Sequence, residues 1–380
     1  MLISMKKNNS DNLSLPTLVS KADKVLFIIH LAIGDFAYLQ SAFKVFKKHY
    51  PSLKIDLFVV ESRCTEDRSK WPYLEKDVIY DWLEGCGLFN KIYRKNYAPH
   101  LFAESISEAK KENYSLIISF GDVHSEPTEK YAREMAGPDS IVAGLKLHIN
   151  WYRFKYQIYK RNLWKNLDIT FKSIPMTKGR HISDLFAFWF EQIGGYQMTE
   201  EEKLPFIDIP QYWQDKATKK LSQLKHNASQ QVIFINYLAK DPNRSWRLEQ
   251  AIELIKKMQQ LPKYADALYF LNTTPDHLSE ISGAIQMANL TNTIPFSATD
   301  NFYELPAILG QSDLIISVET SIIHLANAVN TPLIALMRHK TPEWEPPKKE
   351  ITEVIWCHKK RDKIVDISPL DVIEKIKAYS

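Results

Sequence analysis

Short apolar runs alternate with amphipathic segments along two stretches of the chain, and this alternation most constrains the fold. In the first stretch Lys24–His30 is an apolar run without helical period, 36–50 repeats apolar residues at helical spacing, and 54–60 is apolar again. Apolar runs of this length are typical of strands buried on both faces, and two of them around a helix predict a β-α-β unit. Tyr114–Asp122 is predicted to be a later strand of the same sheet.

The second stretch begins past the middle of the chain and repeats the same order. Strands are predicted at 231–238, 267–274, 313–320 and 331–337, and helices at 247–261, 276–288 and 321–330. Two such series, each with its own first strand, predict an α/β fold of two Rossmann-like, doubly wound domains that face each other across a cleft.

The boundary between the two domains is expected within 179–230, where an aromatic helix at 181–195 gives way to a polar segment. We therefore predict an N-terminal domain over 1–200 and a C-terminal domain over 201–380. The first 20 residues are polar and rich in Ser and Asn, which predicts a loose tail.

Composition excludes several classes of protein. A net charge of +4 argues against a general nucleic-acid binder. Only 11 glycines occur, and no G-x-G-x-x-G or Walker A segment is present, so the usual dinucleotide and P-loop sites are unsupported. The three scattered cysteines, without a C-x-x-C pair, favour a reduced cytosolic compartment. The N-terminal residues lack an apolar segment of secretory length, so no secretory signal is predicted, and the apolar stretches are too short to span a bilayer.

Parallel sheets bind ligands beyond the carboxyl ends of their strands, because helix N-termini leave backbone N–H groups free there. At the first such corner Gly34 is expected to allow a tight turn, and Asp35 opens the next helix. One interpretation is that Asp35 caps this helix. The other is that Asp35 is a general base, since a carboxylate beside a helix N-terminus stays ionised and accepts a hydroxyl proton.

Two further corners carry charged residues. Arg244 follows a strand in a basic loop with Lys240 and Arg247, either as an ordinary exposed residue or as a diphosphate contact, which suits its planar fork. Asp276 either caps the helix that follows it or accepts hydrogen bonds from ribose hydroxyls. The spacing alone leaves both alternatives open.

The fourth corner carries the most polar groups. A strand ends at Glu319, Thr320 and Ser321 open a helix, and His324 falls in its first turn. The hydroxyls, the imidazole and the free N–H groups form an anion cradle, or else an ordinary N-cap beside a His with its hydrogen bonds satisfied. Four such corners in two matched α/β domains favour a nucleotide site.

A metal ion is not expected. The chain lacks the D-x-D triplet that usually clamps a metal on a nucleotide diphosphate. His124 between Asp122 and Glu126 is a weak metal signal, because no further His is clustered nearby. Without a metal or other cofactor, arginine and helix N-termini must neutralise a leaving diphosphate.

The first and fourth corners resemble glycosyltransferase family 9, the ADP-heptose:lipopolysaccharide heptosyltransferases. IGD at 33–35 and SVETSIIHLANAVNTPLIAL at 317–336 carry the resemblance; the latter is similar to the family pattern D-T/S-G-x-x-H-L-A-A-A-L-G-T-P. The similarity extends over most of the chain and is weak in the middle. It implies the GT-B fold, two Rossmann-like domains facing across a cleft, which agrees with the strand pattern.

The resemblance also implies roles for the residues. Asp35 would deprotonate the acceptor hydroxyl, Arg244 would stabilise the departing diphosphate in place of a family lysine, and Asp276 would meet the adenosine ribose. The donor contacts would be Gly34, Glu319, Thr320, Ser321 and His324. The implied reaction is inverting, metal-independent transfer of a heptose from ADP-heptose to a core sugar (Kdo or heptose). Glu319 in place of Asp and Ser321 in place of Gly depart from the pattern and bear on the identity of the donated sugar.

One segment bears on the acceptor. Residues 146–165 contain no acid, and Lys or Arg alternates there with Trp, Tyr and Phe. The segment is either a solvated helix or loop, or a surface that docks on lipid A phosphates and the inner face of the cytoplasmic membrane. The docking residues would be Arg153, Lys155, Lys160 and Arg161.

Three functions are compatible with these patterns. The first is a cytoplasmic glycosyltransferase with a nucleotide-sugar donor, a lipid A-core acceptor and no nucleic-acid partner. The second is a sugar-nucleotide epimerase or hydrolase, which would act on a donor alone. The third is a nucleotide-sugar-binding protein in which Glu319 and Ser321 mark lost transferase activity. The first accounts for the largest number of the residues above.

Overall fold

The computed structural model describes residues 14–121, 127–146, 154–174, 180–339 and 342–378. The chain divides into two compact units. The first contains residues up to 32 together with 41–176 and 183–203, and the second contains 33–40, 177–182 and 204–380.

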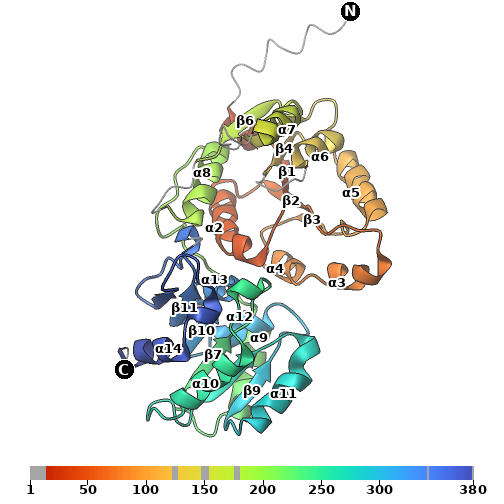
Figure 1. Cartoon of the computed structure of the whole chain (residues 1–380). Helices are drawn as coiled ribbons and strands as arrows, with labels where there is room; N and C mark the ends of the chain where they lie inside the picture. Colours follow the sequence, from red (N-terminus) through yellow and green to blue (C-terminus); the bar gives the residue numbers. More distant parts are fainter. Residues whose placement is uncertain (1–13, 122–126, 147–153, 175–179, 340–341, 379–380) are drawn as a thin grey trace, which may run out of the picture. The chain divides into compact units, whose positions relative to one another are not determined.

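The first unit is built on a six-stranded parallel sheet with strand order β3-β2-β1-β4-β5-β6 (Figure 1). Its strands are β1 (Lys24–Ile29), β2 (Lys54–Val59), β3 (Lys91–Tyr93), β4 (Leu116–Ser119), β5 (Ile141–Lys146) and β6 (Ile169–Lys172). The order reverses between β1 and β4, which is the signature of a doubly wound sheet. The apolar runs predicted to be strands at 24–30, 54–60 and 114–122 form β1, β2 and β4.

Helices cover both faces of this sheet. They are α1 (Leu15–Lys21), α2 (Ile33–His49), α3 (Trp71–Glu75), α4 (Ile79–Gly85), α5 (Pro99–Lys111), α6 (Thr128–Met135), α7 (Phe154–Trp164) and α8 (Ile182–Gly194). Figure 1 shows α5 and α6 on one side of the sheet and α2 and α8 on the other. The predicted loose tail is wrong for 15–20, because α1 buries Leu15 and Val19, while residues 1–13 lie outside the described part.

An aromatic cluster fixes α2 and α8 to the sheet of the first unit. The ring of Phe27 on β1 lies 5.1 Å from that of Phe43 and 5.7 Å from that of Phe46, both on α2, and 5.9 Å from that of Phe190 on α8. All four side chains are fully buried. The phenylalanines at helical spacing in 36–50 therefore form the core-facing side of α2.

The second unit repeats the architecture with strand order β12-β11-β10-β7-β8-β9, again all parallel. Its strands are β7 (Val232–Asn236), β8 (Leu268–Asn272), β9 (Thr293–Phe296), β10 (Leu314–Val318), β11 (Leu333–Met337) and β12 (Thr352–Trp356). The order reverses between β7 and β10. The prediction of two doubly wound α/β domains is confirmed, and their placement across a cleft stays a prediction.

Helices also cover both faces of the second sheet. They are α9 (Gln211–Leu224), α10 (Leu248–Met258), α11 (Leu278–Met287), α12 (Glu304–Leu309), α13 (Ser321–Ala328) and α14 (Pro369–Ala378). The helix α12 packs on α9 and α13, while α10 packs on α14. Every strand and helix predicted in this half is present, each a few residues shorter than the predicted range.

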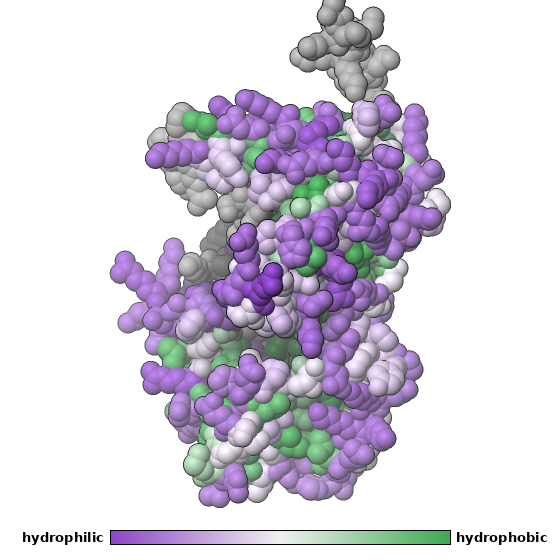
Figure 2. Space-filling view, turned by 90° about the vertical axis from the view of Figure 1, so that its right-hand side faces the viewer, coloured by the Kyte–Doolittle hydropathy of each residue, from purple (hydrophilic) through white to green (hydrophobic). Residues whose placement is uncertain are grey.

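The surface drawn in Figure 2 is hydrophilic over most of its area, with hydrophobic residues in small patches. Within the described residues, no helix combines the length and the apolar character that crossing a membrane requires.

Candidate active site

Polar side chains join the strands of the second unit at the point where the strand order reverses. Asn236 ends β7, and its Nδ2 donates to the hydroxyls of Ser317 at 3.0 Å and Thr320 at 3.1 Å. Nδ2 of Asn272, at the end of β8, donates to the side-chain Oδ1 of Asn236 at 2.9 Å. Doubly wound sheets bind ligands at this switch point. The polar bridge therefore lies where the topology predicts a site.

The head of α13 lies at the same switch point. Thr320 is the N-cap, and its hydroxyl accepts a hydrogen bond from the Ile322 N–H at 3.2 Å. Ser321 is the first helical residue, and both hydroxyl residues are half-buried. A helix N-terminus attracts anions through its free N–H groups and its dipole. An N-cap at Thr320 and an anion cradle at the head of α13 are therefore compatible with each other.

Glu319, directly before this helix, is held by an arginine that the sequence analysis missed. Arg338 follows β11, and its Nε and Nη2 donate to the Glu319 carboxylate at 3.2 and 3.3 Å, while its backbone N–H donates at 3.2 Å. The two side chains are 8% and 13% exposed, so the charges stabilise each other away from bulk water. The carboxylate predicted to contact a donor is therefore engaged by Arg338.

Arg244 belongs to a second ion cluster of the same unit. Its Nε lies 3.7 Å from the carboxylate of Asp241, and Nη1 of Arg338 lies 3.9 Å from the same carboxylate. Hydrogen bonds from Asn243, and the charges of Arg244 and Arg338, lower the pKa of Asp241 below its ordinary value. The guanidinium groups of Arg244 and Arg338 therefore both lie beside the carboxylate of Asp241, in the loop after β7. Trp246, two residues beyond Arg244, is buried in the core and donates to the Ile367 carbonyl.

His324 is enclosed by aromatic side chains. Its Nδ1 lies 2.9 Å from the hydroxyl of Tyr38, and its ring lies 5.2 Å from that of Tyr38 and 5.5 Å from that of Trp344. His181 packs edge-on against Tyr38 at 4.8 Å. Burial, with a smaller contribution from His181, lowers the pKa of His324 to about 3. The imidazole is therefore neutral near pH 7, with one nitrogen bonded to Tyr38.

The first turn of α2 belongs to the second unit and packs on His324. A β-carbon added to Gly34 would lie 3.4 Å from Cδ2 and 3.9 Å from Nε2 of His324. The expectation of a tight turn at Gly34 is wrong, because the helix begins at Ile33 and Gly34 has no positive φ. A β-carbon at Gly34 would make only ordinary van der Waals contact with the imidazole, so the first turn of α2 lies directly against His324. Asp35 is half-buried within the first helical turn rather than at the N-cap.

Asp276 is less closely associated with these residues. It lies in the 3-10 turn Pro275–His277 after β8 and is exposed. The helix that follows begins at Leu278, with His277 as its N-cap. The capping alternative is therefore wrong for Asp276, and its contact with a ribose stays a prediction. Within the described residues, its carboxylate makes no hydrogen bond or ion pair.

The predicted docking residues do not share one environment. Lys155 and Arg161 are exposed on α7. Lys160 is fully buried in the first unit, where its ammonium lies 3.6 Å from the equally buried carboxylate of Glu129. Docking through Lys160 is therefore wrong, because its charge is used internally. Arg153 lies outside the described residues, as do the weak metal candidates at 122–126.

Sequence reasoning missed Tyr38, Asn236 and Arg338. Arg338 directly follows a predicted strand, and Asn236 lies near the carboxyl end of another, so a polar residue at this end of a strand was a usable signal for both. Tyr38 gave no such signal, because it sits at an apolar position of a predicted helix. Only the fold brings it to His324, 286 residues away.

Comparisons with known proteins agree with this architecture. No curated protein matches the chain. Among solved structures, a family 9 glycosyl transferase from Veillonella parvula matches with a TM-score of 0.71 and 14% identity over 96% of this chain and 99% of that one. The E. coli ADP-heptose lps heptosyltransferase II matches with a TM-score of 0.62 and 15% identity, over 93% and 98%. The E. coli heptosyltransferase WaaC with ADP-2-deoxy-2-fluoro heptose matches with a TM-score of 0.60 and 14% identity, over 94% and 100%.

These structural matches show that the chain has the GT-B fold of heptosyltransferases. The family model described as glycosyltransferase family 9 (heptosyltransferase) matches residues 178–370. This range contains the polar bridge, the head of α13 and both arginines. The chain therefore belongs to glycosyltransferase family 9.

Proposed function

We propose that this glycosyltransferase moves a heptose from ADP-heptose to an inner-core lipopolysaccharide sugar, Kdo or heptose, with inversion and without a metal ion. The observation that carries the proposal is the packing of Gly34 on the ring of His324. It brings the helical turn that bears Asp35 into the unit whose switch point carries the anion cradle. A base and a diphosphate site are the two parts that this reaction needs.

Asp35 is the general base of the proposed reaction. Its carboxylate accepts the proton of the acceptor hydroxyl, and the resulting oxygen attacks the anomeric carbon on the face opposite the diphosphate. The bond from that carbon to the diphosphate breaks, and ADP leaves. The position of Asp35 in the first turn of α2 supports this role, because the helix dipole favours the ionised carboxylate that a base requires.

The leaving group needs positive charge and hydrogen-bond donors. Arg244 and the head of α13 supply these, and neutral His324 offers a further hydrogen-bonding nitrogen. Arg338, aligned by Glu319, adds a second guanidinium beside Arg244. Such preorganised donors stabilise developing charge without reorganisation during the reaction.

Replacement of Asp35 tests the proposed base. Asp35→Asn should lower kcat by about 10²- to 10⁴-fold, the contribution of general-base catalysis, while ADP binding stays near that of the wild type. Asp139→Asn, at an exposed position of the first unit, is the matched control and should leave kcat unchanged. Near wild-type turnover in Asp35→Asn would remove Asp35 from the mechanism.

We also propose that the enzyme works in the cytoplasm, at the inner face of the membrane that carries its lipid-linked acceptor. Lys155 and Arg161 support this docking, because both are exposed on α7 near the partly exposed Ile158 and Tyr159. Lys155→Glu with Arg161→Glu should reduce co-sedimentation with anionic liposomes. The same change at Lys110 and Lys111 on α5 is the control. Equal binding by both double variants would refute the docking surface.

A further inference from the structure

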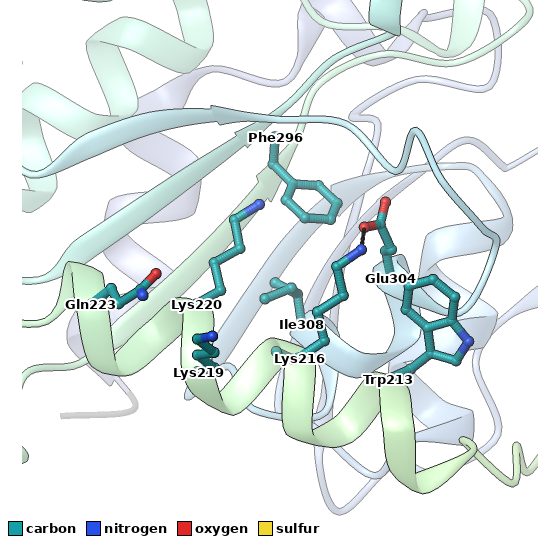
Figure 3. Close-up of a pocket in the computed structure, with 9 residues that line it drawn as sticks. Trp213, Lys216, Lys219, Lys220, Gln223, Phe296, Glu304 and Ile308 are labelled. Atoms are coloured by element: carbon teal, nitrogen blue, oxygen red, sulfur yellow. Dashed lines mark hydrogen bonds and ion pairs between the residues drawn. The ribbon is translucent and has the colours of Figure 1, made fainter.

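A small cavity lies in the second unit between α9, the end of β9 and α12, lined by none of the residues assigned to the active site. Its volume is about 310 Å³. Trp213 and Ala217 of α9, Phe296 of β9 and Ile308 of α12 form its apolar wall, and lysines of α9 lie beside it (Figure 3). This volume is at the lower end of the range for small-molecule sites.

The apolar wall is fixed by the core behind it. Phe296 is 2% exposed, and its ring packs edge-on against Phe234 at 5.5 Å and Phe270 at 5.8 Å. The opposite wall is the helix α9, which packs on α12. The Phe296 side of the cavity is therefore preformed.

The charge of Lys216 at this cavity is balanced. Its ammonium lies 2.6 Å from the carboxylate of Asp300 and 2.9 Å from that of Glu304, and 4.7 Å from the centre of the Trp213 ring. The ion pair with Lys216 lowers the pKa of Asp300, so the carboxylate stays ionised. Lys216 thus ties α9 to α12 and is not available to a ligand.

Lys219 and Lys220 have no such close ion pair, although the charge of Lys220 also acts on the carboxylate of Asp300. The ammonium of Lys220 lies 5.0 Å from the centre of the Phe296 ring, and Figure 3 shows it beside that ring. In the part of the chain that the structure describes, no carboxylate lies within 4 Å of either ammonium. Three lysines beside two carboxylates thus leave an apolar interior with net positive charge beside it.

We propose that this cavity binds a small amphipathic anion, with its apolar group between Trp213 and Phe296 and its carboxylate or phosphate on Lys220. The apolar wall favours a ligand with an apolar group, and Lys219 and Lys220 repel a cation. An ammonium partly shielded by a ring forms a stronger ion pair than one in open water. The proposal concerns a second ligand and does not depend on the proposed heptosyl transfer.

Matched probes with one eight-carbon tail test the class of ligand. Isothermal titration calorimetry of the full chain should detect octanoate, and should show binding at least tenfold weaker for octanol and for octylammonium. Equal binding of octanoate and octanol would overturn the anion site, and no octanoate binding at millimolar concentration would overturn the cavity as a site.

Two variants and a competitor locate the binding. Lys220→Gln should weaken octanoate binding about tenfold, while Lys256→Gln, an exposed lysine on α10, should leave it unchanged. Equal octanoate affinity in both variants would overturn the contact with Lys220. Saturating ADP should not displace octanoate, and displacement would place the probe in the nucleotide site and overturn a separate cavity. Failure of heptosyl transfer would leave all these results unaffected.

Discussion

The burial of His324 predicts a pH dependence of stability. Its folded-state pKa is about 3, against an ordinary value of 6.5, because burial first and His181 second disfavour the charged form. Below pH 6.5 the unfolded chain therefore binds a proton at this residue that the native protein does not bind. The free energy of unfolding must then fall as the pH decreases from 6.5 toward 3.

The magnitude follows from the two pKa values. The proton bound only by the unfolded chain lowers the free energy of unfolding by about 1.4 kcal/mol for each pH unit well below 6.5. Between pH 7 and pH 5 the loss from His324 is about 2 kcal/mol. Removal of the titrating group by His324→Gln removes this part of the pH dependence.

The assay is urea unfolding of wild type and His324→Gln at pH 7, 6 and 5, followed by circular dichroism and fluorescence. Groups other than His324 titrate in both proteins, so they largely cancel in the difference between the two free energies of unfolding. We expect the wild type to lose about 2 kcal/mol more than the variant between pH 7 and pH 5. A difference that does not change with pH would refute the account of a buried, neutral His324.

Two further predictions concern buried ion pairs. Arg338→Gln should lower the free energy of unfolding of the second unit by about 3 kcal/mol in urea, because it leaves the buried carboxylate of Glu319 without its guanidinium; a loss below about 1 kcal/mol would contradict the pairing. Lys160→Met should lower the free energy of unfolding of the first unit by about 3 kcal/mol, because it leaves the buried carboxylate of Glu129 without a partner. Adding Glu129→Gln should restore most of this loss, because the neutral amide removes the unpaired buried charge. No recovery in thermal or urea unfolding would count against the buried pair.

The strands that sequence could predict are the ones buried on both faces. β1, β7 and β10 are continuous apolar runs at the centres of their sheets. β3 has only three residues, and β12, at a sheet edge, begins with the polar residues Thr352 and Glu353, so neither shows such a run. Periodicity reveals central strands because burial on both faces requires an unbroken apolar sequence.

The part of the site that residues adjacent in the sequence form could be predicted. Thr320 and Ser321 follow a predictable strand directly, so the head of α13 could be located from sequence. The partners of these residues come from elsewhere: Tyr38 reaches His324 from the other end of the chain, and Arg338 approaches from the next strand. Such pairings depend on tertiary packing, which no local spacing encodes.

Lys160 shows that the exposure of a side chain also depends on tertiary packing. Its acid-free surroundings in the sequence favour an exposed basic surface, and two of its basic neighbours are indeed exposed. Its own partner, Glu129, lies on another helix of the first unit. Whether a lysine is exposed or paired depends on that long-range contact, so composition could not distinguish the cases.

Transfer itself provides the most direct test of the central claim. The full chain is incubated with ADP-heptose and a Kdo-bearing lipid A acceptor in the presence of EDTA, and the anomeric configuration of any product is determined by NMR. The account predicts a heptosylated product whose anomeric configuration is opposite to that of the donor. A product with retained configuration, or consumption of ADP-heptose without transfer to the acceptor, would contradict it.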